Sequence, residues 1–556
     1  MLDAEASFGH RREELCVRTQ ERHPTAPLET PILIVGAGPV GAVLALELAH
    51  HQVPCVLVER ATTPSRHPKM DYVSGRSMEL LHRLGLADEL RRRGVPAEYR
   101  ANFLWSRGFD EPPVQIWDHP SVTELTDRFA RVNDGSAPVQ AYQRVQGSLL
   151  EQFVRDQARA HPLVDLWEGW SLTDLEQTPD GVSATVVEPA TGTTRLVRAR
   201  YLAGCDGANS SVRRLLAIPL GESGPKTRHC SVYFRSADPA LRRHGRAFVT
   251  IAARGLTLVS RDERDTWTAS LLLTGGAAED AAVDADPMAL VRERLGVDFA
   301  VEEVRSVARW DGTLAVADSY RNGSAFLVGD AAHVFYPTGG FGANTGLADA
   351  VDLGWKLSAL VNGWGGAGLL ESYERERRPV ASFNAEMCAN LMEVWRRFGR
   401  LVRAGASREH VAGFLGRESF QADNVGIHFG YRYGDSPVVW HEDGPAPEWQ
   451  WRAIVPSTWP GGRAPSVRLA DGTSVFDRLG PDYTLVDLSR AGTGEILAKE
   501  AGRRGVPVAY LRVDDPTART AWDRDLVLVR PDHHVAWRGD AAPDDWGAVV
   551  DRVSGR

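Results

Sequence analysis

Three glycines and one glutamate near the start of this 556-residue chain have the types and spacing needed to bind a dinucleotide. The motif GAGPVG follows the apolar run Ile32–Val35, which is typical of a strand buried on both faces. Its glycines allow a tight turn, a close approach to a pyrophosphate and close packing of the next helix. Glu59 ends the next apolar run, where its carboxylate can accept hydrogen bonds from an adenosine ribose. The residues predicted to line this site are Gly36, Gly38, Pro39, Val40, Gly41, Glu59 and Arg60.

The same glycine spacing recurs at Gly363, Gly365 and Gly368. That second match follows a helical pattern with no strand before it, so it predicts a loop. The first match is followed by a helical pattern over residues 42–50, whose free N–H groups would point at the phosphates. An ordinary strand–helix–strand unit is the alternative for the first match, but it would leave Glu59 without a role.

Two further polar side chains stand at the ends of predicted elements, where ligands commonly bind. Asp330 follows the buried run Phe326–Val328. It could cap a helix, but the adjoining glycine loop favours a hydrogen bond to a cofactor polyol. Arg76 lies in the first turn of a helix predicted over Ser74–Arg93. It could face solvent, but the loop before it favours a phosphate contact.

The segments that must position these residues predict a mixed α/β fold. Alternating strand and helix patterns indicate a Rossmann-like cofactor domain, into which an antiparallel sheet is inserted between residues 232 and 273. A smaller α/β unit follows a segment rich in proline, glycine and tryptophan. The predicted boundaries are 1–29 for a polar leader, 30–97 with 139–215 and 315–400 for the cofactor domain, 98–138 with 216–314 for the substrate domain, 401–455 for a helical linker, and 456–556 for the C-terminal unit.

Composition and charge limit the classes of function. The net charge of −9 at pH 7 argues against a nucleic-acid surface. The longest apolar stretch, Ile32–Ala49, is interrupted by proline, glycine and a glutamate, so we expect no membrane span. Five scattered cysteines without a CxxC pair, and a leader without a secretory signal, predict a cytoplasmic protein. His533 and His534 follow Asp532 without further ligands at metal spacing, so we expect no metal site.

Three motifs in order now resemble the single-component flavoprotein aromatic hydroxylases, the para-hydroxybenzoate hydroxylase and phenol hydroxylase group. They are GAGPVG with Glu59, CDGANSSVRR, and VGDAAHVFYPTGGFGANTG followed by SYERERRP, and the resemblance covers roughly residues 30–400. The tail, from GGRAPSVRLADGTSVFDRLGPDYTLVDL onward, is similar to the thioredoxin-like C-terminal domain of the phenol and polyketide hydroxylase branch. Because the tail has no CxxC pair, we assign it a packing or assembly role and no dithiol chemistry.

This resemblance implies FAD in the first site, with NAD(P)H as the reductant and molecular oxygen as the co-substrate. It places Glu59 on the adenosine ribose, Arg76 and Gln146 on the cofactor, and Asp330 on the ribityl chain and pyrophosphate. Asp206 belongs to the second motif, which the family associates with both flavin and NAD(P)H. The loop implied to bring backbone N–H groups to the flavin ring contains Pro337, Gly340, Gly342, Ala343 and Asn344.

The resemblance also indicates a base for the reaction. A phenol with a pKa near about 10 is a poor nucleophile when neutral, so a base within hydrogen-bond reach should assist its deprotonation. The stretch KMDYVSGRSMELL resembles the region of phenol hydroxylases in which an aspartate faces the substrate, and this makes Asp71 the predicted catalytic base. A local turn is the alternative role for Asp71. Weaker candidates for lining the site are Tyr72, His333 and Tyr336.

The chain departs from the family pattern at two points. Tyr336 stands where many relatives have a second proline. No arginine or tyrosine near Thr266–Ser270 matches those that assist in phenol hydroxylase.

The expected function is a monooxygenase that hydroxylates a phenolic or polyketide-type aromatic compound through a flavin C4a-hydroperoxide. A Baeyer–Villiger oxygenase or an epoxidase would use the same flavin peroxide and is the first alternative. A flavin-binding regulator or inactive scaffold is an alternative of another class, against which the intact Asp71, Gly342 and Asn344 argue. The sequence leaves the substrate, the regiochemistry, the choice between NADH and NADPH, and homo-oligomer formation open.

Overall fold

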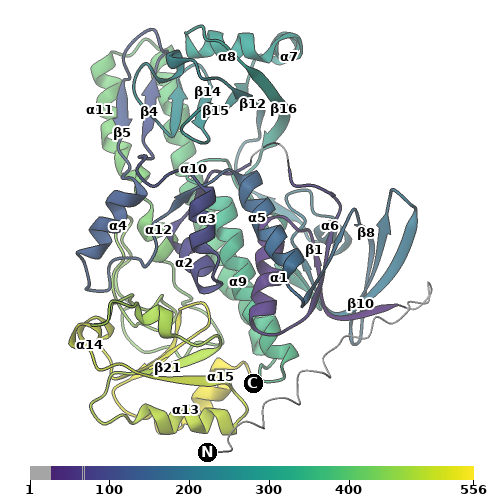
Figure 1. Cartoon of the computed structure of the whole chain (residues 1–556), viewed down its shortest axis with the longest axis vertical. Coiled ribbons are helices and arrows are strands. Elements are labelled where there is room, and N and C mark those ends of the chain that lie inside the picture. Colours follow the sequence, from purple (N-terminus) through teal and green to yellow (C-terminus); the bar gives the residue numbers. More distant parts are fainter. Residues whose placement is uncertain (1–26, 66, 68) are drawn as a thin grey trace, which may run out of the picture.

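The computed structural model describes residues 27–65, 67 and 69–556. The predicted leader, residues 1–29, therefore lies almost entirely outside the described residues, as does Cys16. A sheet flanked by helices occupies the middle of Figure 1, a second sheet lies above it, and the C-terminal unit lies below.

The middle sheet has the strand order β18-β19-β10-β1-β2-β7, and β8 and β9 extend it from β10. Strand β1 pairs in parallel with β2 on one side and with β10 on the other. Its last four residues are buried, as expected for a parallel strand with both faces covered. The strand bounds are β1 Leu28–Val35, β2 Cys55–Glu59, β7 Val164–Glu168, β8 Ser171–Thr178, β9 Gly181–Glu188, β10 Thr193–Gly204, β18 Arg321–Asn322 and β19 Ala325–Leu327.

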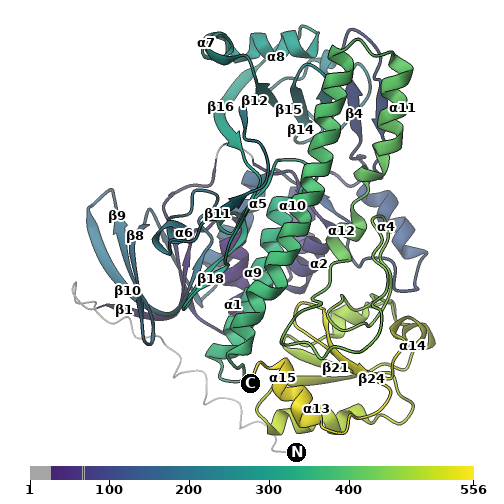
Figure 2. The same ribbon diagram turned by 180° about the vertical axis from the view of Figure 1, so that it is seen from behind.

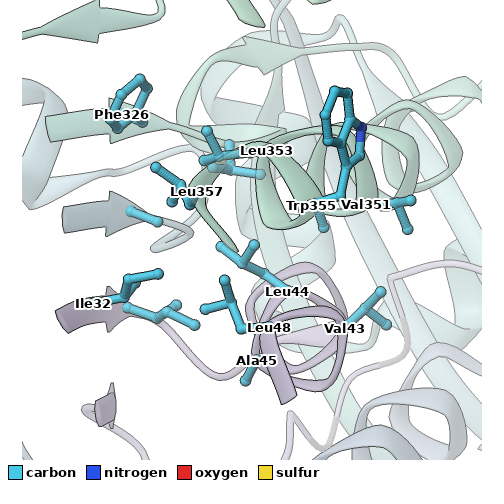
Figure 3. Packing of buried hydrophobic residues seen from close by; sticks show 14 of the residues in the cluster. Ile32, Val43, Leu44, Ala45, Leu48, Phe326, Val351, Leu353, Trp355 and Leu357 are labelled. Carbon is cyan, nitrogen blue, oxygen red and sulfur yellow. The ribbon is translucent and has the colours of Figure 1, made fainter. Parts of the chain in front are cut away.

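Helices α1 (Pro39–His50) and α9 (Phe341–Val361) pack against each other beside this sheet. Figure 3 shows Leu44 of α1 between its own helix and the side chains of α9, including Leu353. A Cβ atom at Gly354 of α9 would lie 2.4 Å from a side-chain carbon of α1, so the missing side chain lets the helices approach closely. This packing fixes the first turns of both helices near each other.

The second sheet has the order β16-β12-β15-β14-β13-β4-β5 and is mostly antiparallel, as the sequence predicts for the substrate domain. Helix α10 (Gly368–Arg403) is 36 residues long and runs from the middle sheet to this one (Figure 2). The strand bounds are β4 Phe103–Ser106, β5 Gln115–Trp117, β12 Thr227–Arg235, β13 Val249–Ala252, β14 Leu256–Ser260, β15 Thr266–Leu273 and β16 Glu303–Gly312.

The helix predicted over Ser74–Arg93 is in fact two helices, α2 (Gly75–Arg83) and α3 (Ala87–Arg93). Gly85 interrupts the pattern with a left-handed φ of 73°, a conformation that ends helices. The other short elements are β3 Tyr72–Val73, β6 Gln143–Arg144, α4 Val122–Ala130, α5 Gly147–Ala160, α6 Ser211–Leu215, β11 Leu220–Glu222, α7 Gly276–Ala285, α8 Pro287–Leu295, β17 Ala315–Ala317, β20 His333–Val334, α11 Arg408–Glu418 and α12 Val425–Phe429.

The C-terminal unit is a four-stranded sheet in the order β22-β21-β23-β24. Strands β21 and β22 are parallel and are connected by α13, whereas β23 and β24 run antiparallel. The bounds are β21 Tyr483–Asp487, α13 Gly494–Arg503, β22 Val508–Arg512, α14 Pro516–Trp522, β23 Leu526–Val529, β24 Val535–Gly539 and α15 Trp546–Val553.

A buried network of charges joins the C-terminal unit to the cofactor domain. The Arg530 guanidinium donates to Glu376 of α10 at 2.7 Å, to Asp352 of α9 at 2.9 Å and to Asp532 at 2.8 Å. Lys356 adds bonds of 2.7 Å to Asp352 and 2.6 Å to Glu376, and none of these side chains is more than 4% exposed. Burial raises the pKa of Asp352 to about 8. A buried ion pair is stable only when its hydrogen bonds are complete, so this geometry fixes how the two parts meet.

Replacing Arg530 with lysine should lower the free energy of unfolding by roughly 1–3 kcal/mol. A lysine ammonium has three N–H donors on one nitrogen, whereas the Arg530 guanidinium makes five bonds to three carboxyl groups from three separate nitrogens. Urea denaturation of the FAD-loaded protein measures the change, and Arg519→Lys, at a half-exposed pair with Asp525 in the same unit, is the matched control. Equal stabilities of the two variants would mean that the network contributes nothing to holding the unit in place.

Among the described residues, none of the helices combines the length and the apolar character needed to cross a bilayer. The same part of the chain contains no group of three His, Cys, Asp or Glu side chains arranged to hold a metal ion.

Candidate cofactor and substrate site

The glycine turn between β1 and α1 has the geometry that its sequence predicts. Gly36 has φ 104°, and a Cβ there would lie 2.5 Å from the Cys205 carbonyl oxygen. A Cβ at Gly41 would lie 1.9 Å from the Gly36 carbonyl oxygen. At Gly38 a Cβ would meet nothing within 4 Å. The first and last glycines are therefore required by packing, whereas the middle one faces open space into which a phosphate can come close.

The first turn of α1 is open to an anion. Gly38 is the N-cap, it provides no side-chain cap, and the turn contains no acidic residue. The free N–H groups and the helix dipole together favour a negative group at this end.

Glu59 braces the turn from the end of β2. Its Oε2 accepts a hydrogen bond from the Ala37 N–H at 2.7 Å, and its Oε1 accepts one from the Ala61 N–H at 2.8 Å. Arg155 of α5, which the sequence analysis missed, is buried behind the turn and donates from Nε to the Ala37 carbonyl at 3.1 Å. No pattern around Arg155 indicated this contact, because its partner is more than a hundred residues away. Arg60 is exposed next to Glu59.

Asp330 lies in the 3-10 turn Gly329–Ala331 after β19. Its side chain is exposed, although the protein around it raises the pKa of its carboxyl by desolvation, with His333 and Lys69 opposing that shift. A Cβ at Gly342 would lie 3.9 Å from Asp330 Oδ1, so Asp330 faces the first turn of α9. The Asp330 carboxylate is thus open to solvent beside the first turn of α9.

Lys69 is a second residue that the sequence analysis missed. Its exposed ammonium is close enough to Asp330 and Glu151 to lower the pKa of both carboxyls, although desolvation raises them more. Lys69 therefore supplies a positive charge beside Asp330, at a position where the sequence has no periodic pattern.

The first turn of α9 is also uncapped. Gly340 is its N-cap, with φ 67° and no side-chain hydrogen bond to the helix. Asn344 accepts from the Ser74 N–H at 2.8 Å and donates to the carbonyls of Tyr72 at 3.0 Å and Gly340 at 2.6 Å. The Asn344 side chain therefore clamps the loop to β3. Pro337 and Ala343 lie in the same loop and first turn.

Asp206 contacts the base of the site. Its Oδ2 accepts from the N–H groups of Ser211 at 2.6 Å and Val212 at 3.2 Å, which caps α6, while its Oδ1 is buried with no described partner. A Cβ at Gly36 would lie 2.9 Å from the Asp206 Cα, so Asp206 sits against the glycine turn. Arg213 of α6 donates to the Ala331 carbonyl at 2.9 Å and ties this segment to the Asp330 turn.

The structure does not bring Arg76 to the glycine turn. Its guanidinium donates to the Asp532 carbonyl at 2.5 Å and to Glu79 at 3.3 Å, at the interface with the C-terminal unit. These contacts do not support the expected phosphate contact, because the C-terminal unit folds back onto α2 and takes up the side chain. Gln146, the N-cap of α5, accepts a hydrogen bond from the Tyr233 hydroxyl at 3.0 Å.

Asp71 lies where the cofactor domain meets the second sheet. Its Oδ1 is paired with Nη1 of Arg261, which follows β14, and its side chain is 15% exposed. Its Oδ2 has no partner among the described residues. Arg261 is held in turn by Thr268, at 3.0 Å from Nε. Burial raises the pKa of Asp71, and Arg261 opposes that shift. Arg261 is thus an arginine partner for Asp71 that no pattern near Thr266–Ser270 revealed.

The other candidate lining residues differ in their contacts. Tyr72, next to Asp71, stacks on Tyr142 with ring centroids 5.2 Å apart. His333 is fully buried and bonds to Asp349 at 2.8 Å, so it supports the loop from behind. Tyr336 donates to the Pro225 carbonyl at 2.7 Å, which anchors the loop to the start of the second sheet. Of the three, only Tyr72 is adjacent to the predicted base.

These features fit a flavin dinucleotide. Two uncapped helix ends, the open face at Gly38 and the Lys69 ammonium suit phosphates, while Glu59 and Asp330 offer acceptors for hydroxyl groups. Asp71 is paired with Arg261 on the side of the second sheet, and the Asp71 side chain is 15% exposed.

Comparison with known proteins agrees with this geometry. Residues 29–387 match the family described as "FAD binding domain", and residues 457–556 match the one described as "Aromatic-ring hydroxylase, C-terminal". The chain is 33% identical to the FAD-dependent monooxygenase apdD of Emericella nidulans over 96% of this chain and 92% of that protein. It is also 33% identical to the tetracenomycin B2 monooxygenase-dioxygenase of Streptomyces olivaceus, over 95% of this chain and 98% of that protein.

Among solved structures, the flavin-dependent monooxygenase PieE in complex with FAD and substrate superimposes with a TM-score of 0.85. The two sequences are 28% identical, and the match covers 95% of this chain and 100% of that one. The likeness extends through both sheets and the C-terminal unit.

Proposed function

We propose that this chain, which belongs to the FAD-dependent aromatic-ring hydroxylases, hydroxylates a phenolic or polyketide-type aromatic compound and uses Asp71 as the base. As a member of that family it is a flavin monooxygenase that uses oxygen and a reduced nicotinamide. The observation that carries the proposal is the buried pair of Asp71 and Arg261 at the junction of the cofactor domain and the second sheet.

FAD, when bound, supplies the activation of molecular oxygen. We assign its phosphates to the first turn of α1 around Gly38 and its adenosine ribose to Glu59. Asp330 would hold the ribityl hydroxyls, and the loop 337–344 would contact the flavin ring. The free backbone N–H groups at the two helix ends and the carboxylates of Glu59 and Asp330 support these assignments.

The protein's own contribution to the reaction is placement of the substrate and removal of its proton. Arg261 holds Asp71 at Oδ1, which leaves Oδ2 to accept the phenolic proton. Loss of that proton raises the electron density of the aromatic ring and makes it a better nucleophile. Exclusion of water from the junction by bound substrate would suppress the unproductive release of hydrogen peroxide.

A substrate screen under labelled oxygen tests the function. The FAD-loaded protein is supplied with NADH or NADPH and a panel of phenols and polycyclic phenols, and product is scored against hydrogen peroxide. We expect a phenol that gains one labelled oxygen atom at a ring carbon. A ring-expanded lactone or an epoxide would instead identify the alternative oxygenases, and peroxide alone with every compound would contradict the proposal.

Replacing Glu59 with glutamine should weaken FAD binding roughly 10- to 100-fold, the effect of losing hydrogen bonds to a charged acceptor. The change removes the negative charge that accepts from Ala37 and Ala61. Titration of the apoprotein with FAD, followed by quenching of flavin fluorescence, measures the affinity. Glu176→Gln, at an exposed position of β8, is the control and should bind FAD as the wild type does. An unchanged affinity in Glu59→Gln would remove Glu59 from the cofactor site.

We also propose a cytosolic location, supported by the buried and unpaired thiols of the described cysteines, Cys55, Cys205, Cys230 and Cys388. Comparison of the native mass with the chain mass decides the oligomeric state.

A further inference from the structure

A cavity of about 390 Å³ lies between the cofactor domain and the C-terminal unit. It lies within the 300–1,000 Å³ range typical of small-molecule sites. Its lining residues come from α1 and α2, from the segment before β6, and from the C-terminal unit: His50, Glu79, His82, Arg83, Val139, Phe476, Asp477, Leu479, Gly480, Pro481 and His533.

This cavity shares no residue with the cofactor site. His50 is the last residue of α1, whereas the glycine turn is at the first, about 16 Å away along the helix axis. In Figure 1 the C-terminal unit lies below α2, on the side away from the second sheet. A ligand here would therefore not contact the flavin or its substrate.

Arg83 is one of the lining residues, and it carries buried donors without acceptors. Its Nη2 is paired with Glu47, but its Nε and Nη1 have no partner in the described part of the chain, and the side chain is only 10% exposed. A guanidinium can only donate, so a buried arginine with two unbonded nitrogens calls for an acceptor. His50 Nε2 and His533 Nδ1, also among the lining residues, are likewise buried and without a described partner.

The carboxylates around the cavity are already engaged. Both oxygens of Glu79 accept from Arg463, at 2.6 and 2.9 Å, and one of them also accepts from the Val139 N–H at 2.8 Å. Asp477 accepts from the Ser474 N–H at 3.0 Å and bonds to His82 at 2.9 Å. Donors therefore remain in excess, and a ligand that supplies negatively charged oxygen atoms would satisfy them.

The rest of the lining is apolar and aromatic. The rings of Phe476 and His533 lie with centroids 4.3 Å apart and a tilt of 39°. Leu479, Pro481 and Val139 complete that side. Burial lowers the pKa of His50 to about 4, and burial also lowers the pKa of His533, so both rings are neutral near pH 7. A flat apolar body suits these walls better than a small inorganic ion.

We propose that this interdomain cavity is a binding site for a small aromatic carboxylic acid, with the carboxylate on Arg83 and the ring against Phe476 and Leu479. The acid contacts both the cofactor domain and the C-terminal unit, so its binding stabilises the interface between them. This site is separate from the one that carries the hydroxylation.

Calorimetric titration of the FAD-loaded protein with 2-naphthoate tests the site. Arg83→Gln should weaken binding at least tenfold, as loss of a charged hydrogen bond does. Leu479→Trp fills the apolar side without touching a charge and should abolish binding. Arg243→Gln, at an exposed arginine of the substrate domain, is the matched control and should bind as the wild type does. The flavin absorbance should not change during the titration.

Four other outcomes would contradict the proposed site or one of its contacts. Binding that survives Leu479→Trp, or that shifts the flavin spectrum, would place naphthoate in the substrate site. Equal affinity for 2-naphthamide would exclude recognition of the charge, and equal affinity for inorganic phosphate would exclude recognition of the ring. If Arg83→Gln fails to fold because the buried Glu47 loses its arginine partner, Leu479→Trp alone decides. No binding of naphthoate to the wild type at millimolar concentration would overturn the proposal.

Discussion

Replacing Asp71 with asparagine should slow hydroxylation by roughly 100- to 10,000-fold, the usual contribution of a general base. Asparagine has the same shape as aspartate but cannot accept a proton at neutral pH. Reduction of the flavin by NAD(P)H and binding of FAD should be unchanged, because the described partner of the Asp71 carboxylate is Arg261, which follows β14. Stopped-flow measurement of product formation and of flavin reduction separates these steps.

The pH profile gives the sharper test of this role. Burial raises the pKa of Asp71 above its ordinary value, and Arg261 limits the rise. A base is active only when deprotonated, so the wild-type rate should fall as the pH falls through that pKa. The Asp71→Asn variant should lack this acidic limb.

Stability must be controlled in this comparison, because asparagine removes the carboxylate that pairs with the buried Arg261. Loss of one partner of a buried pair costs about 3–5 kcal/mol. Asp71→Glu keeps both the charge and the base and should recover part of the rate. An asparagine variant that stays folded and keeps both the rate and the acidic limb would show that Asp71 is only the ion-pair partner of Arg261.

The parts of the site that the sequence predicted are those whose physical reasons are local. Gly41 is needed because a Cβ there would meet the carbonyl oxygen of Gly36, five residues earlier, and Gly36 turns the chain with φ 104°. Glu59 ends the strand that follows. The glycine motif and Glu59 lie within about twenty-five residues of each other, so their spacing and the apolar runs before them are enough to predict the site. The C-terminal unit could be predicted from the sequence for a similar reason, because its strands are short apolar runs.

The parts that the sequence could not predict depend on contacts between distant segments. Arg261 meets Asp71 only because the second sheet folds over the cofactor domain. Arg76 was expected at a phosphate, yet it bonds to the carbonyl of Asp532, 456 residues away. Neither of these two contacts is marked by a periodic pattern or by a characteristic spacing, so one sequence alone gives no reason to predict either pair. The interdomain cavity has the same origin, since its walls come from segments as far apart in the sequence as His50 and His533.

Replacing Gly41 with alanine should leave the purified protein without FAD and lower its free energy of unfolding by more than about 3 kcal/mol, as severe overpacking does. The new Cβ would lie 1.9 Å from the Gly36 carbonyl oxygen, far inside van der Waals contact. That oxygen belongs to the backbone, so no side chain can rotate away. Helix α1 must shift off β1, and its first turn then no longer faces the phosphates. The flavin absorbance per chain and a urea denaturation curve measure the two effects.

Gly416→Ala provides the control that separates this clash from the ordinary effect of the substitution. Gly416 lies in α11, and a Cβ there would meet nothing within 4 Å. Alanine in an open helical position should stabilise the protein by about 0.5–1 kcal/mol and leave the flavin content unchanged. Alanine also favours the helix at position 41, so any loss seen there must come from the contact with Gly36 and exceed that gain. A yellow Gly41→Ala protein as stable as the wild type would mean that α1 can move without disturbing the cofactor, and that the close packing of helix on strand is not what shapes the site.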